Sequence, residues 1–305
     1  IARANKRDSR QGLLDFVQNS GAYHAVRTQK IDFLNLKEVD MSRTRLVDQD
    51  LGYQSDRVIT YLKEEGWFVV VDAIKILRTG YFTFANLWHA QSILDKGKDY
   101  FDTVTDSIQG RIFPTTQSLL FTFPEGYQKT IGVEPISRSY QKENAIYQTV
   151  SSQYKAGDTE LFVTVLIPHA RGEDVGKLKS RVKLVEVSAP YKAVGLQIDR
   201  GERSSYLCVK VDLDMDLARE NIRPRYLYSL GKIGYGEFET DASYLFATVN
   251  KGSVTYSASN VLKVLYKNKP LFEALANTHP LQLDGTIERV GFVKWRYWED
   301  TVENK

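Results

Sequence analysis

Apolar and polar residues alternate along much of this chain in short runs, which is the pattern of half-buried β-strands. The clearest case is the stretch 57–88, where RVITYL and WFVVVDAI are two β-rich runs joined by the polar turn Lys63-Glu64-Glu65-Gly66. Gly66 supplies a permissive backbone, so these runs predict a hairpin. The run Trp67–Val71 is almost wholly apolar, which predicts a strand covered on both faces. A third run, Tyr81–Trp88, follows, and we expect the three strands to form the centre of one large antiparallel sheet.

Similar runs recur at short spacing toward the C-terminal end, separated by turn residues. Residues 35–55 are mixed and charged, which predicts a long loop with one short strand. Residues 90–111 predict a loop with a short strand at Tyr100–Val104. The best helical candidate, Leu271–Asn277, is short. The sequence therefore predicts an all-β protein, a large antiparallel multi-stranded β-sandwich of stacked sheets with few helices.

The domain organisation is expected to be simple. Residues 1–12 are polar and basic and predict a linker or surface segment, and one β-sandwich domain is expected over 13–305, with a weak sub-boundary near 188–190. No apolar run reaches the length of a membrane span. The first residues lack both a Met and the pattern of a signal peptide, so we expect a removed signal or the downstream piece of a longer protein.

Composition changes this picture little. The 41 basic and 38 acidic residues give a net charge of +3, which is too even to indicate nucleic-acid binding. The 18 Tyr and 14 Phe residues favour strands, and tyrosine also suits surfaces that stack on sugar rings, although a core role is commoner. The single cysteine, Cys208, alternates like a core position and is predicted to be buried and unreactive.

The histidines form no closely spaced pair of the kind that binds zinc, and no local motif for a serine nucleophile, a phosphate loop or a dinucleotide is present. His89 follows Trp88 and is expected to be buried and hydrogen-bonded. His169 and His279 each lie next to a proline and are expected at the surface or in turns.

Three acidic residues, Asp212, Asp214 and Asp216, alternate in VDLDMDL and would share one face of a strand. That arrangement suits a cation, but the glycine and the later glutamate of a calcium loop are missing. A solvated acidic edge is therefore favoured, and the sequence assigns no metal and no cofactor.

Several motifs occur in a recognisable order: YHAV, a strand that begins with an arginine, GWFVVVDAI, an aromatic strand ending in LWH, and FVTVLIPH. This order, over roughly residues 12–169, resembles the C-terminal β-sandwich domain of heparinase II/III-like polysaccharide lyases. In that family an AHN-type sequence is followed by a "gdywvvvD" strand and a "wH" strand. Asp72 and Trp88-His89 fit the later positions, and His24 looks like the family's earlier histidine, with Ala25 where the family often has Asn.

The resemblance implies cleavage of a uronate-containing polysaccharide, heparan sulfate-like or alginate-like, by β-elimination. Such chemistry needs a base for the proton next to the carboxylate, a group that neutralises the carboxylate, and an acid, often Tyr, for the leaving oxygen. The resemblance implies that His24 and Tyr23 are catalytic. It implies that Arg27, Trp88 and His89 bind substrate.

The resemblance also implies partners. These are an acidic polysaccharide and an N-terminal α/α toroid, as a domain or a separate chain, because no toroid pattern is present in these residues. No nucleic acid is expected as a partner, and the implied location is periplasmic or secreted.

Two other interpretations stay open. The chain is alternatively a non-catalytic carbohydrate-binding or scaffolding β-domain, for which we expect a shallow aromatic platform, with Trp295 or Trp298 as candidates, and a buried His24. The other alternative is a β-rich adhesin or surface-layer module with no sugar role. Exposure of His24 would separate the lyase from both alternatives.

Overall fold

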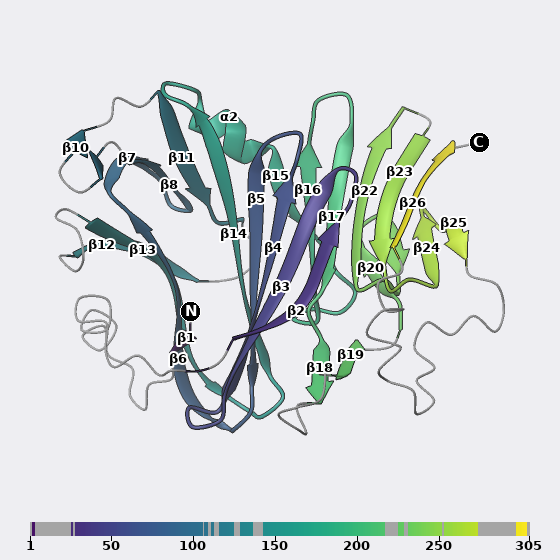
Figure 1. Cartoon of the computed structure of the whole chain (residues 1–305), viewed down its shortest axis with the longest axis horizontal. Helices are drawn as coiled ribbons and strands as arrows, with labels where there is room; N and C mark the ends of the chain where they lie inside the picture. Colours follow the sequence, from purple (N-terminus) through teal and green to yellow (C-terminus); the bar gives the residue numbers. More distant parts are fainter. Residues whose placement is uncertain are drawn as a thin grey trace. The chain divides into compact units, whose positions relative to one another are not determined.

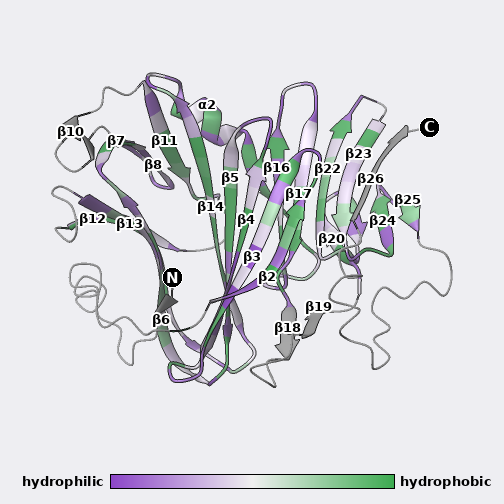
Figure 2. Cartoon of the chain, in the orientation of Figure 1, coloured by the Kyte–Doolittle hydropathy of each residue, from purple (hydrophilic) through white to green (hydrophobic). Residues whose placement is uncertain are grey.

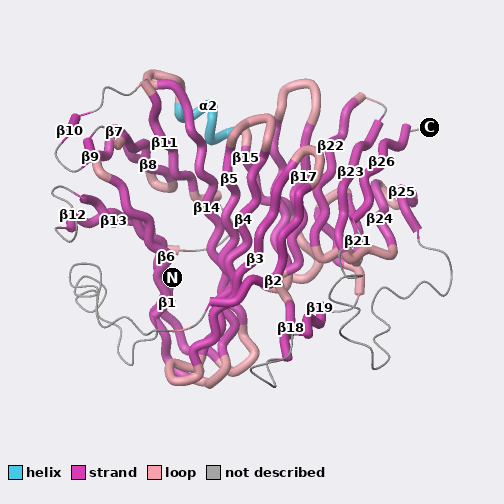
Figure 3. The backbone as a smooth tube through the Cα atoms, viewed as in Figure 1, coloured by secondary structure: helices cyan, strands magenta, loops and turns pink. Residues whose placement is uncertain are grey.

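The computed structural model of the chain is dominated by β-strands (Figure 1). It describes residues 2–3, 26, 28–105, 107–108, 111–112, 116–124, 129–136, 143–216, 225–228, 231–251, 253–273 and 297–303. Within these residues the helix is α2, Val175–Ser180, and the strands form antiparallel sheets (Figure 3). The predicted all-β class with few helices is confirmed. None of the helices in the described part is long and apolar enough to cross a membrane.

The backbone divides into two compact units. Unit 1 consists of Ile1–Phe33 and Asp40–Lys179, and unit 2 of Leu34–Val39 and Ser180–Lys305. The chain enters unit 2 at Leu34, returns to unit 1 at Asp40 and enters unit 2 again at Ser180. The weak boundary near 188–190 stays a prediction.

Unit 1 is built around an eight-stranded sheet and a four-stranded sheet. The first has the order β2-β3-β4-β5-β14-β11-β8-β7, with bounds Thr28–Asn35, Val39–Asp48, Tyr53–Leu62, Trp67–Ile76, Thr159–Ala170, Gln117–Thr122, Tyr100–Val104 and Ser92–Lys96. The second has the order β1-β6-β13-β12, with bounds Ala2–Arg3, Gly80–Ala90, Glu143–Tyr154 and Thr130–Ile136. A small ribbon pairs β9, Ser107–Ile108, with β10, Arg111–Ile112.

The predicted hairpin is present as β4 and β5, which pair from Tyr53 with Ile76 to Leu62 with Trp67. Gly66 has a positive φ of 69°, as the turn requires. The third predicted strand, β6, does not join these two as expected, because it pairs with β13 in the four-stranded sheet. The crossing lets Phe82 and Phe84 of β6 pack with Ile74 of β5 in one apolar cluster.

Two regions differ from the sequence-based expectation. Residues 35–55 contain the ten-residue strand β3 in place of a long loop. Its buried positions include Arg43 and Arg45, so charged residues hide the alternation from a hydrophobicity pattern. The helical candidate Leu271–Asn277 begins inside strand β25, Lys269–Glu273, and its remainder lies outside the described residues.

Apolar side chains of the two sheets of unit 1 form the interior. Figure 2 shows hydrophobic residues along β5 and β14. Trp67, Val69, Val70 and Val71 are all at most 3% exposed, so the central strand is covered on both faces for most of its length, while Phe68 is 37% exposed. A strand whose two faces are both buried does not alternate between apolar and polar residues in the sequence.

Unit 2 repeats the arrangement with two further sheets. Its six-stranded sheet has the order β15-β16-β17-β22-β23-β26, with bounds Val182–Val185, Ala193–Asp199, Ser204–Lys210, Tyr244–Asn250, Ser253–Ser259 and Tyr297–Glu303. The four-stranded sheet is β20-β21-β24-β25, of which the first three span Ile233–Tyr235, Phe238–Thr240 and Lys263–Tyr266. A ribbon pairs β18, Leu213–Asp216, with β19, Arg225–Tyr228.

An apolar and aromatic cluster forms the core of unit 2, and its most deeply buried rings include Tyr235, Phe238 and Tyr256. Cys208 belongs to this core and is 1% exposed, and burial raises the pKa of its thiol. The cysteine is therefore buried as predicted, and a raised pKa keeps it in the unreactive thiol form.

Candidate functional site

The residues implied by the family resemblance fall into two groups. Tyr23, His24 and Arg27 lie outside the described residues. Trp88 and His89 are neighbours on β6, and successive side chains of a strand point to opposite faces. The structure therefore separates these two side chains.

His89 is more exposed than expected. Its side chain is 42% exposed, and its Nδ1 lies 2.7 Å from Oε1 of Glu143 on the neighbouring strand β13. The expectation of a buried histidine is wrong, because the aromatic run that precedes it places Trp88, not His89, on the inner face. Trp88 packs against Phe121, with ring centroids 5.8 Å apart.

Asp72 and Arg57 form a charged pair in unit 1. They lie directly opposite each other on β5 and β4. Arg57 Nε donates to Asp72 Oδ1 at 2.6 Å and Nη2 donates to Oδ2 at 2.9 Å, a two-point contact that fixes the guanidinium. Burial by itself lowers the pKa of Arg57, but the hydrogen bond and charge of Asp72 more than offset this and raise that pKa. Arg57 therefore stays protonated near neutral pH.

Further polar side chains continue from this pair across the sandwich. Arg57 Nη2 donates to Asn86 Oδ1 at 3.2 Å, and Asn86 Nδ2 donates to Gln148 Oε1 and to Thr164 Oγ1, each at 3.3 Å. Trp88 Nε1 also donates to Thr164 Oγ1, at 3.2 Å. We call these residues the polar belt: Arg57, Asp72, Asn86, Trp88, Gln148 and Thr164.

The two-residue period of the strands determines where the polar belt lies. On β6, Asn86 lies two residues from Phe84, which belongs to one apolar cluster, and two from Trp88, which packs on another. On β14, Thr164 lies in the same way between Phe162 and Leu166. The belt therefore separates two apolar clusters inside one sandwich, and it joins the two sheets.

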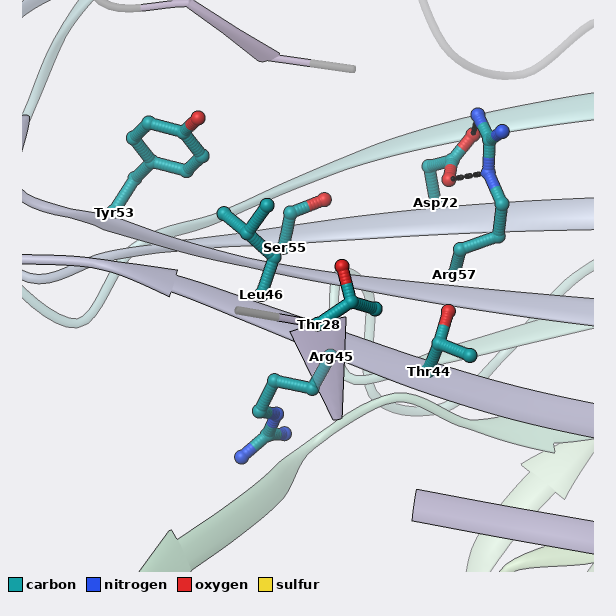
Figure 4. A pocket seen from close by; sticks show the side chains of 8 residues that line it. All are labelled: Thr28, Thr44, Arg45, Leu46, Tyr53, Ser55, Arg57 and Asp72. Atoms are coloured by element: carbon teal, nitrogen blue, oxygen red, sulfur yellow. Dashed lines mark hydrogen bonds and ion pairs between the residues drawn. The ribbon is translucent and has the colours of Figure 1, made fainter. Parts of the chain in front are cut away.

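A cavity of about 150 Å³ opens beside the charged pair (Figure 4). It is lined by Thr28, Thr44, Arg45, Leu46, Tyr53, Ser55, Arg57 and Asp72. In Figure 4 the side chain of Arg45 points away from the Arg57–Asp72 pair. The Arg45 guanidinium is bound to Asp56 on the other face, with Nη2 2.6 Å from Oδ2.

Tyr53 closes one side of the cavity as a neutral phenol. Burial, and secondarily the negative charge of Asp48, raise the pKa of Tyr53 to about 12. Its hydroxyl therefore keeps its proton near neutral pH and remains a hydrogen-bond donor.

His169 lies in another buried polar pair that the sequence did not predict. It is 5% exposed on β14, with Nε2 2.9 Å from Asp102 Oδ1 and Nδ1 2.9 Å from the carbonyl oxygen of Ala170. The expected surface position is wrong because Pro168 does not end the strand. Pairing of β14 with β5 ends at Leu166, so Pro168 lies where the strand has a partner on one side, and its missing N–H is tolerated.

Among the described residues, no group of three or more His, Cys, Asp or Glu side chains is placed to hold a metal ion. The backbones of Asp214 and Asp216 lie on β18, which pairs with β19. His279 falls outside the described residues.

The sequence pointed to Asp72 and Trp88 but missed the rest of the belt. The contact of Arg57 with Asp72 could have been predicted, because a four-residue turn that pairs Leu62 with Trp67 also pairs Arg57 with Asp72. Asn86, Gln148 and Thr164 are distant in sequence and carry no local signal.

No family model and no curated protein matches this sequence. Among solved structures, the heparan sulfate lyase HepC from Pedobacter heparinus is similar with a TM-score of 0.41 at 14% identity, over 56% of this chain and 26% of that one. A heparinase III gene product is similar with a TM-score of 0.40 at 13% identity, over 60% of this chain and 28% of that one. The chain thus spans about a quarter of the length of these structures. A likeness this weak assigns no activity to it.

Proposed function

We propose that this chain is the β-sandwich portion of a polysaccharide lyase that cleaves a uronate-containing polysaccharide, heparan sulfate-like or alginate-like, by β-elimination. One observation carries the proposal. Asp72 and Trp88, the motif residues of β5 and β6, come from different sheets and meet through Arg57, which pairs with the first and lies 5.2 Å from the ring centroid of the second. Residues that resemble a family motif in sequence thus form one physical unit.

The chemistry assigns a role to each candidate. A base removes the proton from the carbon next to the uronate carboxylate, the bond to the glycosidic oxygen breaks, and a carbon–carbon double bond forms. An acid returns a proton to the leaving oxygen. In this proposal His24 and Tyr23 carry the two proton transfers, and Arg27 offsets the charge on the carboxylate. His89 contacts the sugar chain from the exposed face of β6, whereas Trp88, on the inner face, holds Arg57 in place. An α/α toroid completes the cleft.

The test is ultraviolet absorbance of the unsaturated uronate product, with heparan sulfate, chondroitin sulfate and alginate as substrates. The chain is assayed alone and together with the N-terminal toroid of its parent gene, if the gene encodes one. We expect a rise in absorbance that His24→Ala abolishes and that His279→Ala, a matched histidine substitution, leaves unchanged. No rise on any substrate in either format would reject the lyase.

A second candidate is a carbohydrate-binding β-domain without catalysis. It is favoured by one surface feature, the ring contact of Tyr61 with Phe68 at a centroid distance of 4.8 Å, next to the partly exposed Ile59. Aromatic faces of this kind stack on sugar rings. Polysaccharide binding that Phe68→Ala weakens, without any unsaturated product, would favour this candidate.

A further inference from the structure

We propose that the cavity beside Arg57 binds an oxyanion, a carboxylate or a sulfate group, through the free edge of the Arg57 guanidinium and the hydroxyls of Thr44 and Ser55. This site goes beyond the proposed function, because it stands whether or not the chain has lyase activity. Three features support the site: donors with no partner among the described residues, the fixed position of these donors, and the size of the cavity.

Arg57 has hydrogen-bond donors that its contacts with Asp72 and Asn86 do not use. A guanidinium carries five N–H groups, and the contacts with Asp72 and Asn86 use Nε and Nη2. Nη1 has no hydrogen-bond partner among the described residues. The side chain is 28% exposed, so solvent reaches this edge. The two N–H groups of Nη1 are therefore available to a ligand.

These donors are held in place before any ligand arrives. Asp72 fixes the guanidinium at two points, and the Trp88 ring lies against it with the ring centroid 5.2 Å from the guanidinium carbon. A donor that is already immobilised loses little side-chain entropy on binding. This favours an oxyanion that accepts one charge-assisted hydrogen bond from Nη1.

The hydroxyls come from the neighbouring strands. Thr44 on β3 and Ser55 on β4 line the cavity, and their hydroxyls make no hydrogen bond to another residue in the described part of the chain. In Figure 4 these hydroxyls and that of Thr28 are drawn on the same side of the strands as the guanidinium of Arg57. A hydroxyl with no protein partner is free to donate to an anion.

Size limits the ligand. A cavity of about 150 Å³ corresponds to roughly five water molecules at about 30 Å³ each. Sites for whole small-molecule ligands are commonly about 300–1,000 Å³. The cavity therefore suits one anionic group, either free or as a substituent of a larger sugar chain that continues into solvent.

The negative charges near the cavity limit the directions from which an anion can bind. Asp72 is held on the Nε side of Arg57, and Asp48 accepts the backbone N–H of Leu51 at 2.8 Å. Both carboxylates repel an anion, so a ligand must approach through Nη1 and the hydroxyls. We expect weak binding of free anions for this reason.

The experiment is an NMR titration of the ¹⁵N-labelled full chain with sodium sulfate, with glucuronate, and with neutral glucose, at constant ionic strength. We expect both anions to shift the amides of Thr44, Ser55 and Arg57, and glucose to leave them unchanged. Thr44→Val removes one donor at nearly constant volume and should weaken anion binding by about tenfold, the effect of one hydrogen bond to a charged group. Thr130→Val, an exposed position on β12, is the matched control and should have no effect.

A heparan sulfate oligosaccharide forms the last arm. Binding at these amides tighter than that of free sulfate, and weakened by Thr44→Val, would identify a polysaccharide substituent as the ligand, while equal affinity would identify a free anion. Shifts that spread evenly over the surface, or that survive Thr44→Val together with Ser55→Ala, would overturn the site. Anion binding without unsaturated product would reject the lyase and keep this site.

Discussion

The interior of unit 1 contains a hydrogen-bonded row of polar side chains, whereas the core cluster of unit 2 consists of apolar and aromatic residues. Both units contain large antiparallel sheets with buried faces. Unit 2 also buries polar groups. Lys210 donates to the carbonyl oxygens of Gly231 and Asp241 at 3.1 and 3.0 Å. The Arg200 side chain is 2% exposed and pairs with Glu38, which also accepts a hydrogen bond from Thr248.

The difference bears on function. Burying polar and charged groups costs free energy unless each finds partners, and an apolar interior of equal volume is often more stable. Unit 2 shows that this β-rich architecture forms around an apolar cluster. The polar belt joins side chains of both sheets of unit 1 in one network, which makes it a candidate for a site as well as a contribution to packing.

The largest effect is expected in the apolar core of unit 2. Phe238 is 1% exposed and contacts both Tyr206 and Tyr266 through its ring, at centroid distances of 5.0 and 4.9 Å. Phe238→Ala should lower the free energy of unfolding by about 3–5 kcal/mol, because a cavity replaces the ring. Urea denaturation measures the loss, and Phe33→Ala, at a position 53% exposed, should change little.

Breaking the charged pair of the belt should come next. Asp72→Asn leaves the Arg57 guanidinium without its counter-ion in a largely buried place, which should cost about 3 kcal/mol of unfolding free energy. Glu202→Gln removes an exposed ion pair with Lys251 and is the control, for which we expect little change. Equal stability of the two variants would show that solvent, not Asp72, neutralises Arg57.

A belt variant that keeps the volume should cost less. Thr164 is 0% exposed, accepts hydrogen bonds from Asn86 and Trp88, and donates to Gln148. Thr164→Val leaves these partners unsatisfied and should lower the free energy of unfolding by about 2 kcal/mol. If the variant were more stable than the wild type in thermal denaturation, the belt would be a net cost that the fold tolerates.

The smallest expected effect is the change in the free energy of unfolding with pH that comes from Tyr53. The pKa of Tyr53 is about 12 in the folded chain against the ordinary 10.0, so the unfolded state loses its proton first. The contribution of Tyr53 to the free energy of unfolding is fully present below pH 10 and is lost as the pH rises toward about 12. At one pH unit above 10 the loss should be about 1.4 kcal/mol. Urea denaturation of Tyr53→Phe should show a shallower fall between pH 9 and 11 than the wild type, and identical slopes would contradict this.

Local patterns in the sequence predicted the strands well where one face is apolar. The hairpin of β4 and β5, the short strand Tyr100–Val104 and the burial of Cys208 all follow from patterns within a few residues. Two of the failures, the missed strand β3 and the position of His169, share one cause. Buried strand positions are occupied here by the polar residues Arg43, Arg45 and His169. The sequence around a polar residue does not show whether the fold will supply a hydrogen-bond or ion-pair partner for its side chain.

The sequence alone determined the all-β class, the β4–β5 hairpin and, through its four-residue turn, the pairing of Arg57 with Asp72. These depend on period-two alternation and local turn geometry, which need no distant partner. Only the tertiary structure decided that β6 joins the facing sheet, that Trp88 points inward while His89 points outward, and that Asn86, Gln148 and Thr164 complete the belt. Those contacts join residues more than ten positions apart, and they form because burial leaves each polar group no solvent to bind.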